Sequence, residues 1–196
     1  MKLGVVLLAG GEGRRIGGAK PSRMLGGRSL LDWVLAAARA WSDDIRIAVR
    51  SSDPAAGLGL EILVDDPSIG GPLAGIASAL RHAESSGLDA VLTLPCDTPF
   101  LPTDLPERLL SALEGVLAVL ASSGRALHPT CGLWARSAAE ALPVYLASGR
   151  RSIRGFAAGI GHAEVEWPVE PVDPFFNIND LADLAQAEEW LRLRNR

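Results

Sequence analysis

The residues best suited to chemistry lie in a glycine-rich segment that follows the first apolar run of the chain. Residues 9–27 contain seven glycines together with Arg14, Arg15 and Lys20. Glycines let backbone N–H groups approach phosphate oxygens as an anion-binding nest, and basic side chains add charge-assisted hydrogen bonds. We interpret the segment as a loop for a nucleoside triphosphate; the alternative is an ordinary surface loop with incidental charge.

Two familiar phosphate-binding motifs do not fit this segment. A Walker A loop has Ser or Thr directly after its lysine, whereas Pro21 follows Lys20. The dinucleotide fingerprint has a third glycine where Ile16 stands, and an acid at the end of the second strand where Arg50 stands. These mismatches disfavour a P-loop protein and an NADP-dependent oxidoreductase.

A carboxylate, Asp97, follows the apolar run 90–94, which we expect to be a buried strand. The carboxyl ends of parallel strands share one edge of a sheet, and ligands of open α/β sheets bind there. A hard carboxylate at that edge suits the Mg²⁺ that accompanies a triphosphate. We predict that Asp97 binds Mg²⁺; the alternative is that it braces a turn or caps the helix that starts near Thr103.

Acidic and small residues precede the next expected helix. Asp65 and Asp66 lead into Gly71, Pro72 and Gly75. Small residues let a nucleoside approach a helix start closely, and a carboxylate can accept the N1–H and N2–H₂ donors of guanine. The alternative is a plain loop with proline in the first helical turn. Which aspartate would meet the base stays open.

Candidates for a second, anionic substrate lie in the C-terminal half. Asn177 and Asn179 stand one residue apart, so on an extended backbone they would project to the same side and could read a polar heterocycle. They could equally form a turn and a helix cap. Arg150, Arg151 and the run 128–130, His-Pro-Thr, are lesser candidates.

Apolar runs alternate with helical patterns along the chain, which is typical of an open α/β sheet with right-handed crossovers. We expect one Rossmann-like domain of three layers, whose sheet is mostly parallel with at least one antiparallel strand. The expected strands are 3–8, 45–49, 61–64, 90–94, 116–120, 128–134 and 165–169, and the expected helices are 29–41, 72–85, 103–113, 137–147 and 180–193.

Composition narrows the function classes. The 196 residues fit one domain with its own core, and 48% hydrophobic residues argue against disorder. A net charge of −4 disfavours a nucleic-acid partner, and no apolar run approaches the ~20 residues of a membrane span. Cys96 and Cys131 lie far apart in sequence and form no C-x-x-C pair, which gives little support to a disulfide or a zinc site, so a reducing cytoplasm is the expected location. His82 and His162 show no zinc spacing and are expected at the surface.

Taken in order, four of these motifs resemble the molybdenum cofactor guanylyltransferase family. They are Leu8-Ala9-Gly10-Gly11 with Arg15 and Lys20, Gly71-Pro72-Leu73-Ala74-Gly75, Pro95-Cys96-Asp97-Thr98-Pro99 and Asn177-Ile178-Asn179. The resemblance spans nearly the whole chain. It implies a nucleotidyltransferase fold and an enzyme that moves GMP from GTP to the phosphate of molybdopterin, with release of pyrophosphate.

The resemblance also implies roles for individual residues within one domain, residues 1–196. GTP would bind the N-terminal half, the pterin would bind the C-terminal half, and Arg15, Lys20 and Asp97 would be catalytic. The implied GTP contacts are Leu8, Ala9, Gly10, Gly11, Arg15, Lys20, Asp65 or Asp66, Gly71 and Asp97 with its Mg²⁺. The implied pterin contacts are Arg150, Arg151, Asn177 and Asn179.

Two departures from the family pattern keep alternatives open. Ala19 stands where the family often has an acid, and the loop 66–71 is short. The alternatives are a cytidylyltransferase acting on the same pterin, a sugar-1-phosphate nucleotidyltransferase, and a non-catalytic nucleotide-binding partner. Beyond GTP and molybdopterin, the candidate partners are a cofactor-inserting protein and a small GTP-binding adaptor.

Overall fold

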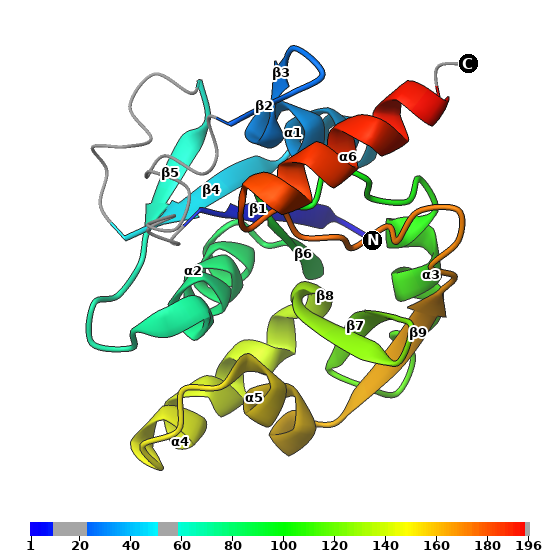
Figure 1. Cartoon of the computed structure of the whole chain (residues 1–196). Coiled ribbons are helices and arrows are strands. Elements are labelled where there is room, and N and C mark those ends of the chain that lie inside the picture. The colour runs from blue at the N-terminus through cyan, green and yellow to red at the C-terminus, as the bar shows by residue number, and fades with distance from the viewer. Residues whose placement is uncertain (10–22, 51–58, 195–196) are drawn as a thin grey trace.

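The structure is a computed structural model that describes residues 1–9, 23–50 and 59–194. Its centre is one sheet, drawn in Figure 1. In spatial order the strands are β5 (Glu61–Val64), β4 (Ile45–Val49), β1 (Leu3–Leu8), β6 (Ala90–Pro95), β8 (Ala126–Ala135), β7 (Ala118–Ser123) and β9 (His162–Trp167). Neighbouring strands run parallel except β8, which is antiparallel to both β6 and β7. The predicted sheet, mostly parallel with an antiparallel strand, is confirmed.

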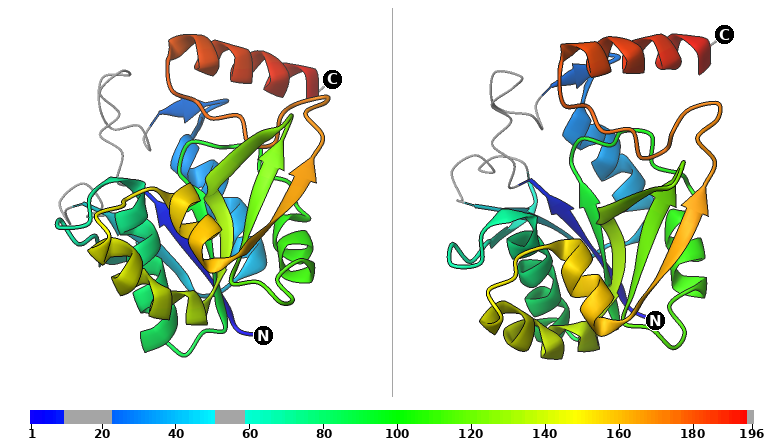
Figure 2. Two further views of the ribbon diagram at one scale, coloured as in Figure 1. Left: turned by 90° about the horizontal axis from the view of Figure 1, so that it is seen from below. Right: turned by 60° about the horizontal axis from the view of Figure 1, so that its bottom comes forward.

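Helices cover both faces of this sheet (Figures 1 and 2). On one face α1 (Leu30–Trp41) and α3 (Leu105–Ser111) pack over one apolar cluster. On the other face α2 (Gly71–Ser85), the 3₁₀ helix η4 (Arg136–Ala141), α4 (Leu142–Ala147) and α5 (Ile153–Ile160) pack over a second. A smaller third cluster lies between α6 (Leu181–Arg194) and the hairpin of β2 (Met24–Leu25) and β3 (Arg28–Ser29).

Local sequence explains where the main helices begin. The Ser29 hydroxyl accepts the Asp32 backbone N–H at 3.1 Å and caps α1, as predicted. Pro72 stands in the first turn of α2, where a backbone N–H is not needed. None of the helices in the described ranges is long and apolar enough to cross a membrane.

Several boundaries differ from the sequence-based expectation. The pattern 137–147 splits into η4 and α4, because Pro143 has no N–H with which to continue the preceding helix. β9 ends at Trp167 rather than at residue 169, because Pro168 cannot donate to the ladder. Helix α5 was not predicted, and neither was the tight turn between β7 and β8, where Gly124 and Arg125 have positive φ.

One histidine is not where the sequence placed it. His82 is 8% exposed, and its Nε2 lies 2.7 Å from Asp44 Oδ1. Burial on α2 with a carboxylate partner makes it part of the packing between α2 and the loop before β4, so the prediction of a surface histidine is wrong.

Candidate active site

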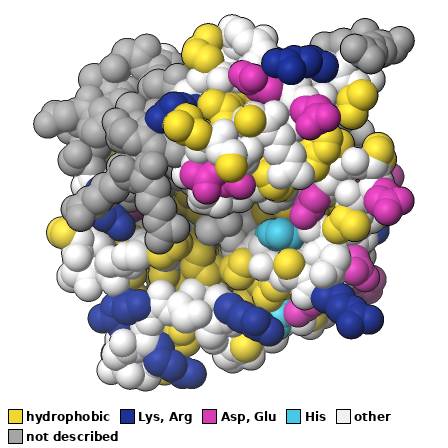
Figure 3. All heavy atoms as spheres, in the orientation of Figure 1, with side chains coloured by type: hydrophobic (Ala, Val, Ile, Leu, Met, Phe, Trp, Pro, Cys, Tyr) yellow, Lys and Arg dark blue, Asp and Glu magenta, His cyan; other side chains and the backbone are white. Residues whose placement is uncertain are grey.

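A cleft lies where the carboxyl ends of β1, β4, β5 and β6 meet, and β8 together with the segment before α6 forms its other side. It is lined by Leu8, Ala48, Arg50, Asp65, Gly71, Pro72, Gly75, Pro95, Asp97, Thr130 and Asn177. Parallel strands bring these distant segments to one edge, which is the position expected for a ligand of an open α/β sheet. In the space-filling view, the middle of one face is hollowed over apolar side chains (Figure 3).

Two glycines shape the side of the cleft formed by α2. A Cβ on Gly75 would lie 2.8 Å from Leu8 Cδ2, so the helix can approach the end of β1 this closely only with glycine there. Gly71 has a backbone φ of +61°, a conformation that residues other than glycine rarely adopt. The backbone at the start of α2 therefore faces the cleft without a covering side chain. The small residues of this segment predicted such a close approach for a ligand.

Asp65 is the acid that this side of the cleft presents. The residue is 6% exposed, and the Ser78 hydroxyl on α2 donates to Oδ1 at 3.0 Å. Burial raises the pKa of Asp65, while the hydrogen bond from Ser78 and the charges of Arg81 and Arg50 act in the opposite direction. Because Ser78 holds the Asp65 carboxylate in place at the cleft wall, Asp65 can accept hydrogen bonds from the N–H groups of a ligand.

Asp66 has a different setting. Its Oδ1 accepts the Ser68 backbone N–H at 2.9 Å and the Ser68 hydroxyl at 2.7 Å, which is the geometry of an Asx turn. These hydrogen bonds lower the pKa of Asp66. Asp66 braces the loop and does not line the cleft, so of the two aspartates that the sequence left open, the structure brings only Asp65 to it.

Asp97 stands two residues beyond the last residue of β6, half-buried and facing the cleft. Its backbone carbonyl accepts the Ile178 N–H at 3.0 Å, which ties the loop after β6 to the segment before α6. Helix α3 starts after Asp104, so Asp97 is not the cap of that helix. Burial and the nearby Asp97 carboxylate raise the pKa of the Cys131 thiol, which is buried and suited to packing.

The two asparagines separate in the structure. Asn177 lines the cleft, whereas Asn179 is exposed and its side-chain amide donates to the Asn177 carbonyl at 3.2 Å. The Asn179 backbone N–H in turn donates to Asp183 at the start of α6 at 2.7 Å. The segment therefore combines a cleft residue with a helix-start structure, and only Asn177 faces the described cleft.

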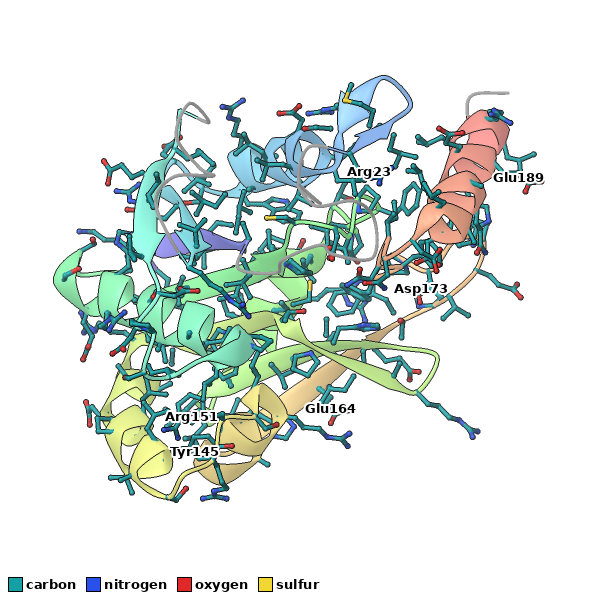
Figure 4. All side chains as sticks on the ribbon, turned by 60° about the vertical axis from the view of Figure 1, so that its left-hand side comes forward. Arg23, Tyr145, Arg151, Glu164, Asp173 and Glu189 are labelled. Atoms are coloured by element: carbon teal, nitrogen blue, oxygen red, sulfur yellow. The ribbon has the colours of Figure 1, made fainter. Side chains whose placement is uncertain are left out.

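Arg150 and Arg151 lie outside the cleft lining, at the turn between α4 and α5. Arg151 donates to the carbonyls of Leu146 and Arg150 at 2.9 and 2.8 Å, and the Arg150 guanidinium lies 4.7 Å from the centre of the Tyr145 ring. Figure 4 shows Arg151 and Tyr145 close together there. Both arginines are exposed, and basic side chains gather over α4 and α5 on the face in Figure 3.

Part of the predicted site lies outside the described residues: Gly10, Gly11, Arg15 and Lys20. Ala9 is described, and its N–H donates to the Ala48 carbonyl at 2.9 Å beside Leu8 in the cleft. Arg50 was missed as a cleft residue. The signal available was a basic residue at the carboxyl end of a predicted strand, which the sequence analysis had used only against the dinucleotide fingerprint.

The amino-acid sequence is similar to known proteins of one family. The model of the MobA-like NTP transferase domain matches residues 5–165. A protein of Cereibacter sphaeroides named molybdenum cofactor guanylyltransferase is 46% identical over 195 residues, and the match covers 98% of each chain.

Solved structures are similar as well. The molybdopterin-guanine dinucleotide biosynthesis protein A of Archaeoglobus fulgidus has a TM-score of 0.78 at 29% identity, covering 96% of this chain and 98% of that one. The 2-C-methyl-D-erythritol 4-phosphate cytidylyltransferase of Thermus thermophilus shares the fold alone, with a TM-score of 0.69 at 24% identity over 98% and 100% of the two chains. The chain belongs to the family of MobA-like NTP transferase domains.

Proposed function

We propose that this protein transfers GMP from GTP to the terminal phosphate of molybdopterin. An oxygen of that phosphate attacks the α-phosphorus of GTP, the bond between the α-phosphorus and its bridging oxygen breaks, and pyrophosphate leaves. The observation that carries the proposal is the cleft itself. It joins acids from the N-terminal half, Asp65 and Asp97, to polar residues from the C-terminal half, Thr130 and Asn177. A relative 46% identical over nearly its full length carries the name of this activity.

The N-terminal half is proposed to hold GTP. Asp65 would accept the guanine N1–H and N2–H₂ donors, with the open backbone at Gly71 beside the base. Arg50 at the cleft wall, with Arg15 and Lys20 of the glycine-rich segment, would neutralise the triphosphate and the leaving pyrophosphate. A phosphate nucleophile is ionised at neutral pH and needs no general base, so positioning and charge neutralisation supply the catalysis.

The chemistry of the donors fits a divalent cation, and we propose Mg²⁺ bound by Asp97. In the described residues no three His, Cys, Asp or Glu side chains lie close enough to hold a metal together. Mg²⁺ in nucleotide sites needs no such cage, because one or two carboxylates act with phosphate oxygens and water. When bound beside Asp97, the cation would neutralise the negative charge that develops on the phosphates during transfer.

The C-terminal half is proposed to hold the pterin, with Asn177 at the junction and Asn179, Arg150 and Arg151 further out. For the two arginines, support comes from their exposure and from the basic side chains over α4 and α5. We expect the reaction in the cytoplasm, where the buried thiols of Cys96 and Cys131 would stay reduced.

The assignment is tested by base choice. GTP with Mg²⁺ should raise the melting temperature more than CTP or ATP with Mg²⁺, because Asp65 matches the paired donors of guanine and a bound ligand stabilises the folded state. Asp65→Asn should remove the preference for GTP, since an amide cannot accept both donors in the same way. Asp66→Asn is the matched control and should keep the preference. A larger shift with CTP in the wild type would favour the cytidylyl alternative.

Lys20 is tested separately. Lys20→Ala should weaken GTP binding by about 1.5–3 kcal/mol, the usual range for a hydrogen bond to a charged group. Isothermal titration with GTP measures it, and Lys2→Ala, at the other lysine of the chain, serves as the control. Unchanged affinity would show that the glycine-rich segment does not hold the triphosphate through this residue.

Release of pyrophosphate separates an enzyme from a non-catalytic nucleotide-binding protein. Pyrophosphate should appear only when GTP and molybdopterin are both present. Tight GTP binding without any release would support the binding protein, and release with a sugar 1-phosphate as acceptor would support the other nucleotidyltransferase.

A further inference from the structure

A chain of three polar side chains joins β7, β8 and the segment before α6, and it has no part in the proposed site. Ser123 Oγ, at the end of β7, is 2.7 Å from His128 Nε2 on β8 and 2.9 Å from Asp173 Oδ1. The Phe175 backbone N–H also donates to Asp173 Oδ1 at 2.9 Å. Asp173 lies on the segment that runs from β9 to α6 (Figure 4). Three separate parts of the fold thus meet at one serine, which is 1% exposed.

These residue types match those of a hydrolytic triad, but their order does not. In a triad the histidine stands between the serine and the acid and takes the serine proton. Here the serine stands between the histidine and the acid, and it is buried. Ser123 is therefore not arranged as a nucleophile, and the group whose state the cluster determines is His128.

The hydrogen bonds fix the tautomer of His128. A carboxylate only accepts, so the single proton of the Ser123 hydroxyl points to Asp173. The Ser123 oxygen is then an acceptor, and its partner Nε2 must carry the ring proton. The lone pair of the neutral ring is left on Nδ1, which makes no hydrogen bond to any other described residue.

The surroundings favour the neutral ring. Burial lowers the pKa of His128, and the opposing effect of the Asp173 charge is smaller. The ring stacks on Phe175 with the ring centres 4.9 Å apart. His128 is half-buried, so part of the side chain remains accessible.

The position of His128 links it to the second substrate. Thr130 lies two residues after His128 and lines the cleft, and Asn177 lies two residues after the stacking partner Phe175 and also lines it. The next residue, Ile178, is bonded to the Asp97 carbonyl. His128 therefore lies close to two cleft residues of the C-terminal half, two residues before Thr130 on β8 and stacked on Phe175, which precedes Asn177 by two residues.

We propose that His128 is a binding residue for the acceptor substrate, and that its Nδ1 accepts a hydrogen bond from an N–H group of the heterocycle. Ser123 and Asp173 are positioning residues that hold the tautomer in which Nδ1 is an acceptor. A pterin carries several N–H donors, and a buried polar acceptor discriminates against ligands that lack its donor. This inference deepens the proposed function and rests on it.

The tautomer is measured directly by NMR of protein labelled with ¹⁵N-histidine. The chain has three histidines, so the spectrum of His128→Asn assigns the signal. In the wild type at neutral pH, Nε2 should be protonated and Nδ1 should not, and addition of molybdopterin should shift the Nδ1 resonance. Ser123→Ala should give a mixture of tautomers. The inference would be overturned if the His128 ring of the wild type were protonated on Nδ1. It would also be overturned if the Nδ1 resonance did not shift on addition of molybdopterin.

Two substitutions separate substrate binding from a structural role. In His128→Asn the side-chain amide stands near the former Nδ1 and can still accept, but it cannot reach Ser123. In His128→Gln the amide can reach Ser123 and loses the acceptor at Nδ1. We expect His128→Gln to raise the KM for molybdopterin about tenfold, and His128→Asn to raise it less, with the KM for GTP unchanged in both. His162→Asn is the control histidine and should behave as the wild type.

The outcomes distinguish the inference from the function on which it rests. Wild-type protein that shows no molybdopterin-dependent release of pyrophosphate would contradict the proposed function. Two results would contradict only the role of His128. One is a His128→Gln variant with the turnover and the KM for molybdopterin of the wild type. The other is a lower KM for molybdopterin in His128→Gln than in His128→Asn. Melting temperatures without ligand report any loss of folding, and the NMR experiment on the wild type needs no variant.

Discussion

Asp97→Asn should reduce the metal-dependent transfer of GMP about a hundredfold or more while the protein stays folded. The substitution keeps the shape of the side chain and removes its charge. An amide oxygen is a poorer ligand than a carboxylate for a hard cation, so the binding of Mg²⁺ with GTP should suffer. Asp97 lines the cleft, and the contact of its loop with Ile178 uses the backbone carbonyl, which the substitution retains.

The measurement is the rate of pyrophosphate release across a titration of Mg²⁺, with the melting temperature recorded without ligand. Asp66→Asn is the matched control, because Asp66 is a nearby aspartate that braces a turn and does not line the cleft. A folded Asp97→Asn protein with full activity would assign Asp97 to bracing the loop, since Asn and Asp form such turns equally well.

The architecture was predictable from sequence because its signals are local. A buried parallel strand is a largely apolar run, and the predicted strands 3–8 and 45–49, the second interrupted only by Arg46, match β1 and β4 residue for residue. The cap at Ser29 and the proline at 72 are short-range signals as well. Helix α5 was not predicted because it is only eight residues long and half of these are Ala or Gly, which gives a weak helical pattern.

The cleft was predictable in part. Asp65 and Asp97 were predicted because the carboxyl ends of parallel strands share one edge, Gly71 from the small residues at the start of a helix, and Asn177 from the asparagine pair and the family resemblance. The choice between Asp65 and Asp66 depends on Ser68 and Ser78, and hydrogen bonds of this kind are not visible as a pattern. The glycine-rich segment with Arg15 and Lys20 stays a prediction.

Contacts between side chains that are distant in sequence could not be predicted. His128 stood out only as one member of the run 128–130, because its setting depends on Asp173, which is 50 residues from Ser123. Likewise, nothing in the sequence shows that Arg151 donates to two carbonyls of its own turn. Such contacts can be identified only once the three-dimensional structure is known.

Trp134 of β8 connects the sheet to two helices of the C-terminal half. The side chain is fully buried, and its Nε1–H donates to Thr93 Oγ1 on β6 at 3.0 Å. Its ring stacks on Phe156 of α5, with the ring centres 5.9 Å apart and the planes 19° apart. Phe156 in turn packs against Tyr145 of α4.

Trp134→Ala should therefore lower the free energy of unfolding by about 3–5 kcal/mol, the usual cost of truncating a buried Trp or Phe, out of the ~5–15 kcal/mol typical of a domain. Trp134→Phe keeps most of the packing and loses one hydrogen bond, which should cost about 1 kcal/mol beyond the change in shape. Trp190→Ala on α6, where the tryptophan is only partly buried, is the control and should cost less. Urea denaturation of the three variants gives these values. Removal of a buried tryptophan leaves a large cavity, and a packed core can fill it only by rearranging. A decrease in the free energy of unfolding below about 1 kcal/mol in Trp134→Ala would therefore mean that the packing of α4 and α5 does not depend on this contact.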